Sequence, residues 1–253
     1  MNWRITAASV IGSSHVANGA QCQDSCWAQV DGFPTGGQLL TMFVADGAGS
    51  ALKGGEGAEL AIQAAADFID KKLNDGEFGL SDFLSVDLVV AVREKIYAKA
   101  STDGLTARDF ACTFLGVLSS EAGTLAFQVG DGGIVVDTGE GLELAIVPMS
   151  GEYANMTHFV TDGDAVQRLV SKTYVGPALR VAAFSDGLQR LALNLAEGTP
   201  HRPFFAKFWH GLETAKPEQD DELHAALVRF LGSQAVNERT DDDKTLVLAM
   251  KLA

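Results

Sequence analysis

Several aspartates of this chain stand in short turns beside apolar segments of strand character. The turns hold Asp46, Asp131, Asp186 and the run 241–243, and Asp24 opens a further such segment. Strand ends from distant parts of one sheet system can meet, and carboxylates that meet repel one another unless a cation neutralises them. Taken together, these acids predict a site for hard divalent cations, which prefer oxygen ligands.

Each of these turns has an ordinary structural explanation when it is taken alone. Asp-Gly is a frequent turn pair, because glycine adopts positive φ and aspartate bonds its own backbone. The run 241–243 alone is typical of a solvated approach to a strand. Gly47, directly after Asp46, would let its carbonyl oxygen approach a cation without a side chain in the way. The metal hypothesis therefore depends on the acids as a set.

Other metal chemistries fit the chain less well. None of the five histidines has the His-x-x-x-His spacing of a zinc hydrolase. Cys22 and Cys26, near His15, lack the second ligand pair of a zinc site, and reduced thiols are the better interpretation. The segment 162–164 (Asp-Gly-Asp) suggests a calcium-binding structural protein, but 166–167 (Val-Gln) replaces residues that an EF-hand loop needs.

Composition argues against a nucleic-acid-binding protein and against a membrane protein. The 253 residues are 47% hydrophobic and carry a formal net charge of −14, from 33 acidic and 19 basic residues. Such a surface repels phosphate backbones, so we expect no nucleic-acid partner. No apolar run approaches the roughly 18 residues of a membrane span, and the N-terminus lacks a secretory pattern. We therefore expect no membrane partner and a cytoplasmic location.

The elements that must position the acids are read from periodicity and turn signals. Helical spacing predicts helices over 52–73 and 81–100 and near 203–214 and 219–232. Alternation and bounded apolar runs predict strands over 3–10, 24–30, 39–45, 110–118, 124–129, 134–137, 179–184 and 245–251. Much of 143–178 is expected to be loop with short elements.

The connections between strands indicate the sheet type. The strands within 110–137 are joined by the turns 121–123 and 131–133, which are too short for parallel crossovers and predict an antiparallel meander. Runs of strands interrupted by helices indicate an α+β fold of antiparallel sheets covered by helices. No linker or repeat divides the chain, so 1–253 is expected to be one domain.

Six short motifs, in this order, resemble the protein phosphatase 2C family and are most similar to its compact bacterial members. Each motif is weak alone, but together they span nearly the whole chain. They are Cys22-Gln23-Asp24-Ser25, Val44-Ala45-Asp46-Gly47-Ala48-Gly49, Ala111-Cys112-Thr113, Gly130-Asp131, Ser185-Asp186-Gly187 and Asp242-Asp243-Lys244-Thr245.

The resemblance implies a fold and an activity. The fold would be a four-layer α-β-β-α sandwich, with two antiparallel sheets packed face to face and helices outside. The activity would be metal-dependent hydrolysis of phosphoserine and phosphothreonine in proteins, with a cognate serine/threonine kinase as a partner. A water molecule activated by two cations would attack phosphorus in line, without a covalent phosphoenzyme.

The resemblance also implies roles for particular residues. Asp46 would bridge two Mg²⁺ or Mn²⁺ ions, and the carbonyl of Gly47 would bind one of them. Asp186 and Asp242 would complete the other ion's site.

Two further acids follow from the same matching. Asp24 would act through a water molecule on the metal. Asp131 stands where some bacterial members hold a third, weaker ion together with the residue matched by Asp186. The expected catalytic residues are therefore Asp46, Asp186 and Asp24.

The chain also departs from the family pattern. Gly19 stands where the family commonly has an arginine that grips phosphate, and Ala48 stands where some members have a histidine. His15 and Arg4 are the candidate substitutes for phosphate contact, although an ordinary structural role is the more common one for each. The alternative function is a catalytically weak phosphatase-like module that binds phosphoproteins or regulates a partner.

Two other segments carry expectations. The polar cluster 152–158, with Asn155 and Thr157, lies where the family has a variable flap, and we expect these two residues to shape substrate access. The aromatic stretch 204–209 could form a partner surface, but core packing is the more common use of such a pattern.

Overall fold

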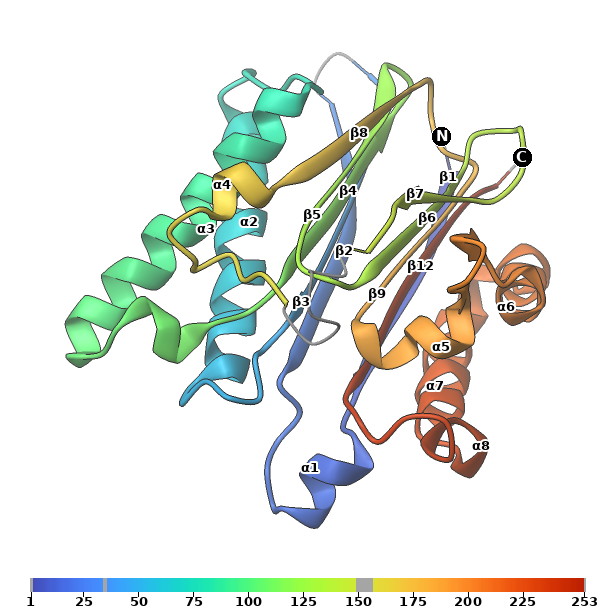
Figure 1. The fold of residues 1–253 in the computed structure, drawn as a ribbon. Helices are drawn as coiled ribbons and strands as arrows, with labels where there is room; N and C mark the ends of the chain where they lie inside the picture. Colours follow the sequence, from blue (N-terminus) through green and yellow to red (C-terminus); the bar gives the residue numbers. More distant parts are fainter. Residues whose placement is uncertain (1, 34–35, 149–156, 253) are drawn as a thin grey trace.

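Two antiparallel sheets packed face to face, with helices on both outer sides, form the architecture (Figure 1). The structure is a computed structural model that describes residues 2–33, 36–148 and 157–252. The predicted α+β fold with a four-layer α-β-β-α sandwich is confirmed. In the described part of the chain, no helix is both long and apolar enough to span a bilayer.

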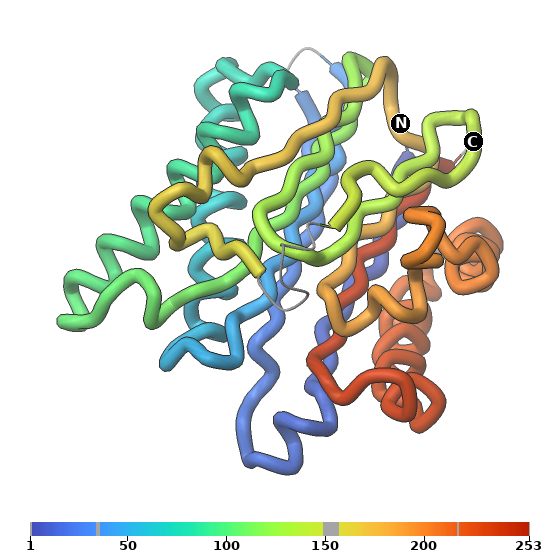
Figure 2. The backbone as a smooth tube through the Cα atoms, in the orientation of Figure 1, coloured from blue at the N-terminus to red at the C-terminus, as the bar shows by residue number. Residues whose placement is uncertain are grey.

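Each sheet has five strands. The first sheet has the order β1-β12-β9-β6-β7, with β1 Asn2–Val10, β12 Lys244–Leu252, β9 Arg180–Phe184, β6 Gly133–Asp137 and β7 Glu143–Ile146. The second has the order β2-β3-β4-β5-β8, with β2 Asp24–Gly32, β3 Gln38–Asp46, β4 Phe114–Ser120, β5 Gly123–Val129 and β8 Val170–Val175. The first and last strands pair along their whole length, so the chain ends lie near each other (Figure 2).

Helices cover both sheets. α2 (Gly54–Asn74) and α3 (Asp82–Asp103) lie on the second sheet, and α6 (Arg202–Thr214) and α7 (Asp220–Leu231) lie on the first (Figure 1). The short elements are α1 Ser13–Ala17, η1 Ala107–Phe110, α4 Ala165–Arg168, η2 Asp186–Leu188, α5 Gln189–Ala192, β10 Leu193–Asn194, β11 Thr199–Pro200, η3 Pro217–Gln219 and α8 Gln234–Asn237.

The period-2 alternation of β3 explains why the layers form. Leu39, Phe43 and Ala45 point to the core beneath α2 and α3, whereas Leu40 and Val44 point into the core between the two sheets. A strand buried on both faces reads as a continuous apolar run, as this one does. Four layers result because each sheet has one face against its partner and one against helices.

The predicted helices and strands are confirmed, with ends that shift by a few residues. The strand expected at 110 begins at Phe114, because residues 107–110 form a 3₁₀ helix. A capping box between Thr106 and Asp109 stabilises the N-terminus of this helix. The stretch 143–178 holds β7, α4 and β8 among loops. The aromatic stretch packs in the core, where Phe204, Phe205 and Trp209 are buried.

The expected meander over 110–137 is wrong in one respect. β4 and β5 form the predicted hairpin, but β6 belongs to the opposite sheet, beside β9. The chain crosses between sheets at 130–132, where Gly130 has φ of +120° and a Cβ on Gly132 would lie 2.6 Å from the Phe184 carbonyl oxygen. Glycine permits both the conformation and the close approach.

Candidate active site

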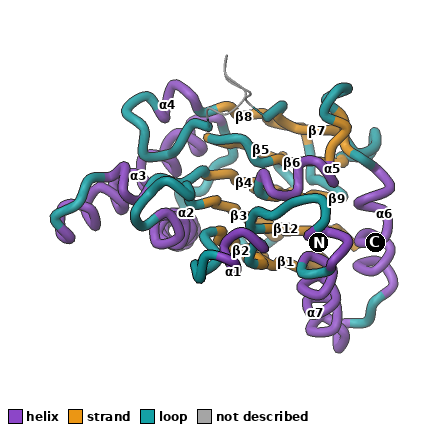
Figure 3. The backbone as a smooth tube through the Cα atoms, turned by 60° about the horizontal axis from the view of Figure 1, so that its bottom comes forward, coloured by secondary structure: helices purple, strands orange, loops and turns teal. Residues whose placement is uncertain are grey.

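The predicted acids come from both sheets and gather at one end of the sandwich. Asp24 and Asp46 face each other in register across β2 and β3. In the other sheet, the Phe184 end of β9 pairs with Leu246, so the loops after β9 and before β12 are neighbours. This is the end at which α1 lies, and Figure 3 turns it toward the viewer.

A pocket of about 340 Å³ lies at this end. Its acidic wall comes from four aspartates and the neighbouring glycine of the predicted set: Asp46, Gly47, Asp131, Asp186 and Asp242. His15, Thr113, Thr157 and Phe159 are among its other lining residues. The predicted site residues are thus brought together, except that Asp24 is buried beside the pocket, with 8% of its surface exposed.

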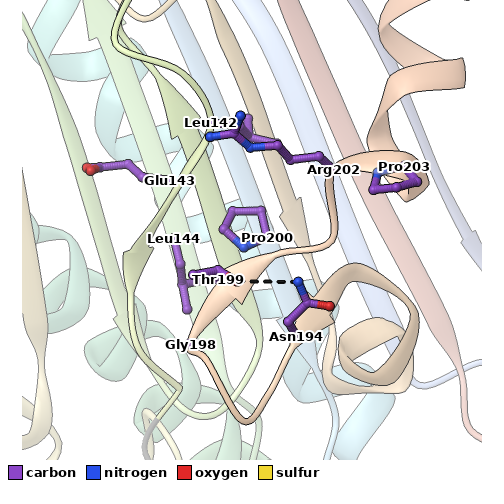
Figure 4. A pocket seen from close by; sticks show the side chains of 9 residues that line it. All are labelled: Leu142, Glu143, Leu144, Asn194, Gly198, Thr199, Pro200, Arg202 and Pro203. Carbon is purple, nitrogen blue, oxygen red and sulfur yellow. Dashed lines mark hydrogen bonds between the residues drawn. The ribbon is translucent and has the colours of Figure 1, made fainter.

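A larger cavity is not the reaction centre. It has a volume of about 510 Å³ and lies between β7 and the β10–β11 hairpin (Figure 4). Its one acid, Glu143, pairs at 2.7 Å with Lys172, and Asn194 donates to Thr199 across the hairpin at 3.4 Å. Since none of the predicted acids lines this cavity, chemistry rather than volume identifies the candidate site.

Asp24 ties three strands together. Its Oδ2 accepts hydrogen bonds from the Ser185 hydroxyl at 2.7 Å and the Thr245 hydroxyl at 2.8 Å. These residues lie at the ends of β9 and β12, in the sheet opposite β2. Its other oxygen, Oδ1, is buried and has no hydrogen-bond partner. One oxygen therefore connects the two sheets, while the other has no hydrogen-bond partner among the described residues.

The backbone around Asp46 is fixed by its neighbours. The Asp46 amide donates to the Thr113 hydroxyl at 3.0 Å, and the Thr113 amide donates to the Asp46 carbonyl at 2.8 Å. A Cβ on Gly47 would lie 2.3 Å from the carbonyl carbon of Gly54, at the start of α2. This close approach requires glycine at position 47. The Ala111-Cys112-Thr113 motif holds the Asp46 backbone through Thr113.

Asp131 and Asp186 are linked through the start of α5. The Thr157 hydroxyl donates to the Asp131 carboxylate, and the Gln189 side chain donates to the Asp131 carbonyl. The Oδ1 atom of Asp186 is buried without a partner. Thr157, expected to shape substrate access, thus contacts a site residue, whereas Asn155 lies outside the described residues.

Asp243 is a site residue that sequence reasoning missed. It is only 2% exposed, and its carboxylate accepts hydrogen bonds from the amides of Gly12 and Gln23, each at 2.6 Å. His15 Nδ1 lies 2.9 Å from its Oδ2. Asp243 therefore shapes the loop that carries His15 to the pocket. The alternation of the last strand could have revealed it. Residues 243 and 247 are four apart and lie on the same face of an extended chain, and Val247 points between the sheets.

Burial and like charge raise the pKa of the gathered acids. The pKa of Asp46 is well above its usual value, first because of burial and then because of Asp24 and Asp186. Burial, followed by Asp131 and Asp242, raises the pKa of Asp186 to about 6. Burial is also the main reason that the pKa of Asp24 rises to about 7. Ionised together, these groups are costly unless a cation joins them.

The donor set fits hard divalent cations. It consists of carboxylate oxygens and a backbone carbonyl, and two buried carboxylate oxygens lack partners. Among the described residues, no three His, Cys, Asp or Glu side chains close around one point as in a metal cage.

Other candidates have structural roles. The Arg4 guanidinium donates to the carbonyl of Leu212 at 2.7 Å and lies 3.5 Å from Asp220, away from the pocket. The three cysteines are free, and the Cys22 thiol donates to the Asp24 carbonyl rather than joining a zinc site.

The Asp-Gly-Asp segment 162–164, a candidate calcium site in the sequence, forms local contacts. Asp162 accepts from the Phe159 amide at 2.9 Å, and Asp164 pairs with Arg168 at 2.9 Å. Both carboxylates therefore have local structural contacts.

Known proteins similar to this chain are phosphatases. The protein phosphatase 2C family model matches residues 11–232. Serine/threonine-protein phosphatase 3 of Escherichia coli K12 is 53% identical over 250 residues, covering 99% of both chains. A bacterial serine phosphatase structure has a TM-score of 0.61 at 14% identity and covers 98% of each chain. The Staphylococcus aureus phosphatase Stp1 has a TM-score of 0.60 at 14% identity, covering 99% of this chain and 96% of its own.

The charge cluster predicts how the stability of the metal-free protein depends on pH. These carboxyls have an ordinary pKa of 3.8, whereas the folded values are about 6 for Asp186 and about 7 for Asp24. Folding therefore favours the protonated forms, and their stabilising effect is complete below about pH 4 and lost as pH rises through 6 and 7. We expect Asp46→Asn, which removes one like charge, to raise the thermal midpoint in chelator increasingly over this window.

Calorimetry from about pH 5 to 8 checks this expectation. Asp164→Asn, a surface acid outside the cluster, is the matched control and should not show the pH-dependent gain. A midpoint difference between Asp46→Asn and wild type that stays constant across the window would contradict the proposed repulsion.

Proposed function

The chain belongs to the protein phosphatase 2C family, and from that premise we propose which of its residues carry out the reaction. It is a protein-serine/threonine phosphatase of a metal-dependent family, and its substrates are phosphoproteins. The observation that supports the assignment of residues is the pocket of converging aspartates with unpartnered buried oxygens. The family and the pocket call for the same chemistry, which is binding of divalent cations beside a phosphoryl group.

The proposed ligands are the lining acids. Asp46 would hold two Mg²⁺ or Mn²⁺ ions, the Gly47 carbonyl would contribute to one site, and Asp186 and Asp242 would contribute to the other. Asp131, with Asp186, would hold a third and weaker ion. The oxygen-only donor set supports this proposal. A structure of the related fold described as RsbX in complex with magnesium has a TM-score of 0.57 at 14% identity.

The chain's own residues then prepare the hydrolysis. Divalent cations in such a site lower the pKa of a water molecule and offset charge on phosphoryl oxygens. Asp24 orients water through its free Oδ1, because its Oδ2 is held by Ser185 and Thr245. Asp46 is kept in place by its paired contacts with Thr113.

Neither neighbouring nucleophile is suited to covalent catalysis. The Ser185 hydroxyl, 1% exposed, donates to Asp24 and accepts from the Thr245 amide at 3.0 Å. Cys112 is fully buried, and burial raises the pKa of its thiol far above neutrality. Direct attack by water is the proposed course.

Phosphate contact is proposed for His15. No lysine or arginine lines the pocket, and His15 is its one basic lining residue among those described. The Nδ1 atom of His15 lies 2.9 Å from the Asp243 carboxylate. The other ring nitrogen, Nε2, therefore points away from that carboxylate. Gly19, which replaces the family's arginine, has φ of +68° and no heavy atom near its missing side chain.

The arginine-free lining also favours a second candidate, a weakly catalytic module that binds phosphoproteins or regulates a partner. The retained acids support the enzyme over this alternative.

We further propose that 1–253 is one catalytic domain and that a cognate kinase phosphorylates its substrates. We also propose that the protein acts in the cytoplasm, where its free thiols stay reduced.

Metal addition and removal test the assignment. We expect hydrolysis of p-nitrophenyl phosphate with Mn²⁺ or Mg²⁺, none in excess chelator, and a loss of at least about a hundredfold in kcat for Asp46→Asn and Asp186→Asn, since even outer-shell changes cost 10–100-fold. Asp70→Asn, which changes an exposed acid of α2, is the control. Turnover that persists in chelator would overturn the proposal, and retention of a phosphoprotein without turnover would favour the binding module.

Replacing His15 tests the phosphate contact. His15→Ala removes a hydrogen bond to a charged group, so KM for p-nitrophenyl phosphate should rise roughly tenfold or more, with the metal requirement unchanged. Steady-state kinetics measure this, and His210→Ala, an exposed histidine of α6, is the matched control. An unchanged KM in His15→Ala would remove His15 from the proposed site.

A further inference from the structure

A second pocket, of about 360 Å³, lies among α5, α6, α7 and α8. Arg190, Lys207, Arg239 and His201 contribute basic side chains to it, and no acid is among its lining residues. The whole chain has 33 acidic and 19 basic residues, so a lining whose titratable side chains are all basic differs from the chain's overall balance. We call these four residues and their cavity the basic pocket.

The lysine and arginine side chains of the basic pocket are available to a ligand, whereas His201 Nδ1 contacts the Leu191 carbonyl at 3.1 Å. In the described part of the chain, no carboxylate forms an ion pair with Arg190, Lys207 or Arg239. Lys207 lies with its Nζ 3.7 Å from the centroid of the Phe230 ring, and burial lowers its pKa. A partly desolvated ammonium of this kind is stabilised by an anion that enters the pocket.

The pocket lined by Asp46, Asp131, Asp186 and Asp242, which we call the acid pocket, is connected to the basic pocket through one short element. Asp186 begins η2, α5 follows directly, and the first residue of α5, Gln189, donates to the Asp131 carbonyl. The next residue, Arg190, lines the basic pocket. The short helix α5 therefore contacts a lining residue of one pocket and contributes a lining residue to the other.

We propose that the basic pocket binds an anionic side chain of the phosphoprotein substrate, a carboxylate or a second phosphoryl group, a few residues from the phosphoresidue in the acid pocket. This inference depends on the proposed function. An extended peptide advances about 3.3 Å per residue, so a few residues suffice to pass α5. The protein's negative charge otherwise repels acidic substrates, and the basic pocket supplies a local region of opposite charge.

The pocket's chemistry fits a side chain of a peptide. Phe204, Phe230 and Pro203 line it beside the cations, so they can contact the aliphatic part of an acidic side chain. Arginine pairs with either a carboxylate or a phosphoryl group through its planar fork. The two anions are therefore distinguished by experiment.

The test compares three phosphopeptides of one sequence. The first has neutral flanking residues, the second has an acidic run at those positions, and the third has a second phosphoserine there. For wild type we expect KM to be roughly tenfold lower for the second or third peptide than for the first, and the combined variant Arg190→Ala/Lys207→Ala/Arg239→Ala to remove the difference. Whichever anion shows the preference identifies the ligand.

The control variant removes three exposed cations elsewhere, as Lys71→Ala/Lys95→Ala/Arg108→Ala. It should keep the preference. We call the Arg190→Ala/Lys207→Ala/Arg239→Ala protein the pocket variant. The proposal would be overturned if the preference is lost in both variants, survives in the pocket variant, or is absent in wild type.

Two readouts separate this inference from the proposed function. Metal-dependent turnover of p-nitrophenyl phosphate reads the acid pocket alone and should be equal in wild type and both variants. Fluorescence anisotropy of the acidic and doubly phosphorylated peptides, measured in chelator, reads the basic pocket without catalysis. A pocket variant that binds both peptides as tightly as wild type would contradict the inference even if the enzyme is active.

Discussion

Buried carboxylates that repel one another are the constraint on which this structure depends. Asp24 is held between the sheets by Ser185 and Thr245, and it faces Asp46 across a strand pair. Asp186 approaches from the opposite sheet. Burial and mutual repulsion raise the pKa of all three acids. A cation bound among these groups would lower the electrostatic cost of keeping them together away from water.

The surrounding loops depend on the same constraint. The buried carboxylate of Asp243 accepts two backbone amides and lies beside His15, so the segment after β1 is drawn toward the pocket. Gly47 brings the end of β3 against the start of α2, and 130–132 carries the chain from one sheet to the other. The strands supply rigidity, and these close approaches place oxygen atoms where ligands can reach them.

Much of the fold could be predicted from periodicity, because β3 and the long helices bury continuous or helically spaced apolar residues. The crossing of β6 to the other sheet could not, since a hairpin and a sheet change begin with the same short Asp-Gly-Gly turn. The acids of the site could be predicted as a set from their order. The basic pocket could not, because no spacing connects Arg190, Lys207 and Arg239, which only the packing of short helices brings together.

The most direct measurement is anomalous diffraction at the manganese edge from crystals grown with Mn²⁺. We expect two strong peaks in the acid pocket, about 3.5–4 Å apart, with the carboxylate of Asp46 between them. Manganese found only on other surfaces, with the pocket filled by water alone, would contradict the claim that these carboxylates are gathered to hold cations.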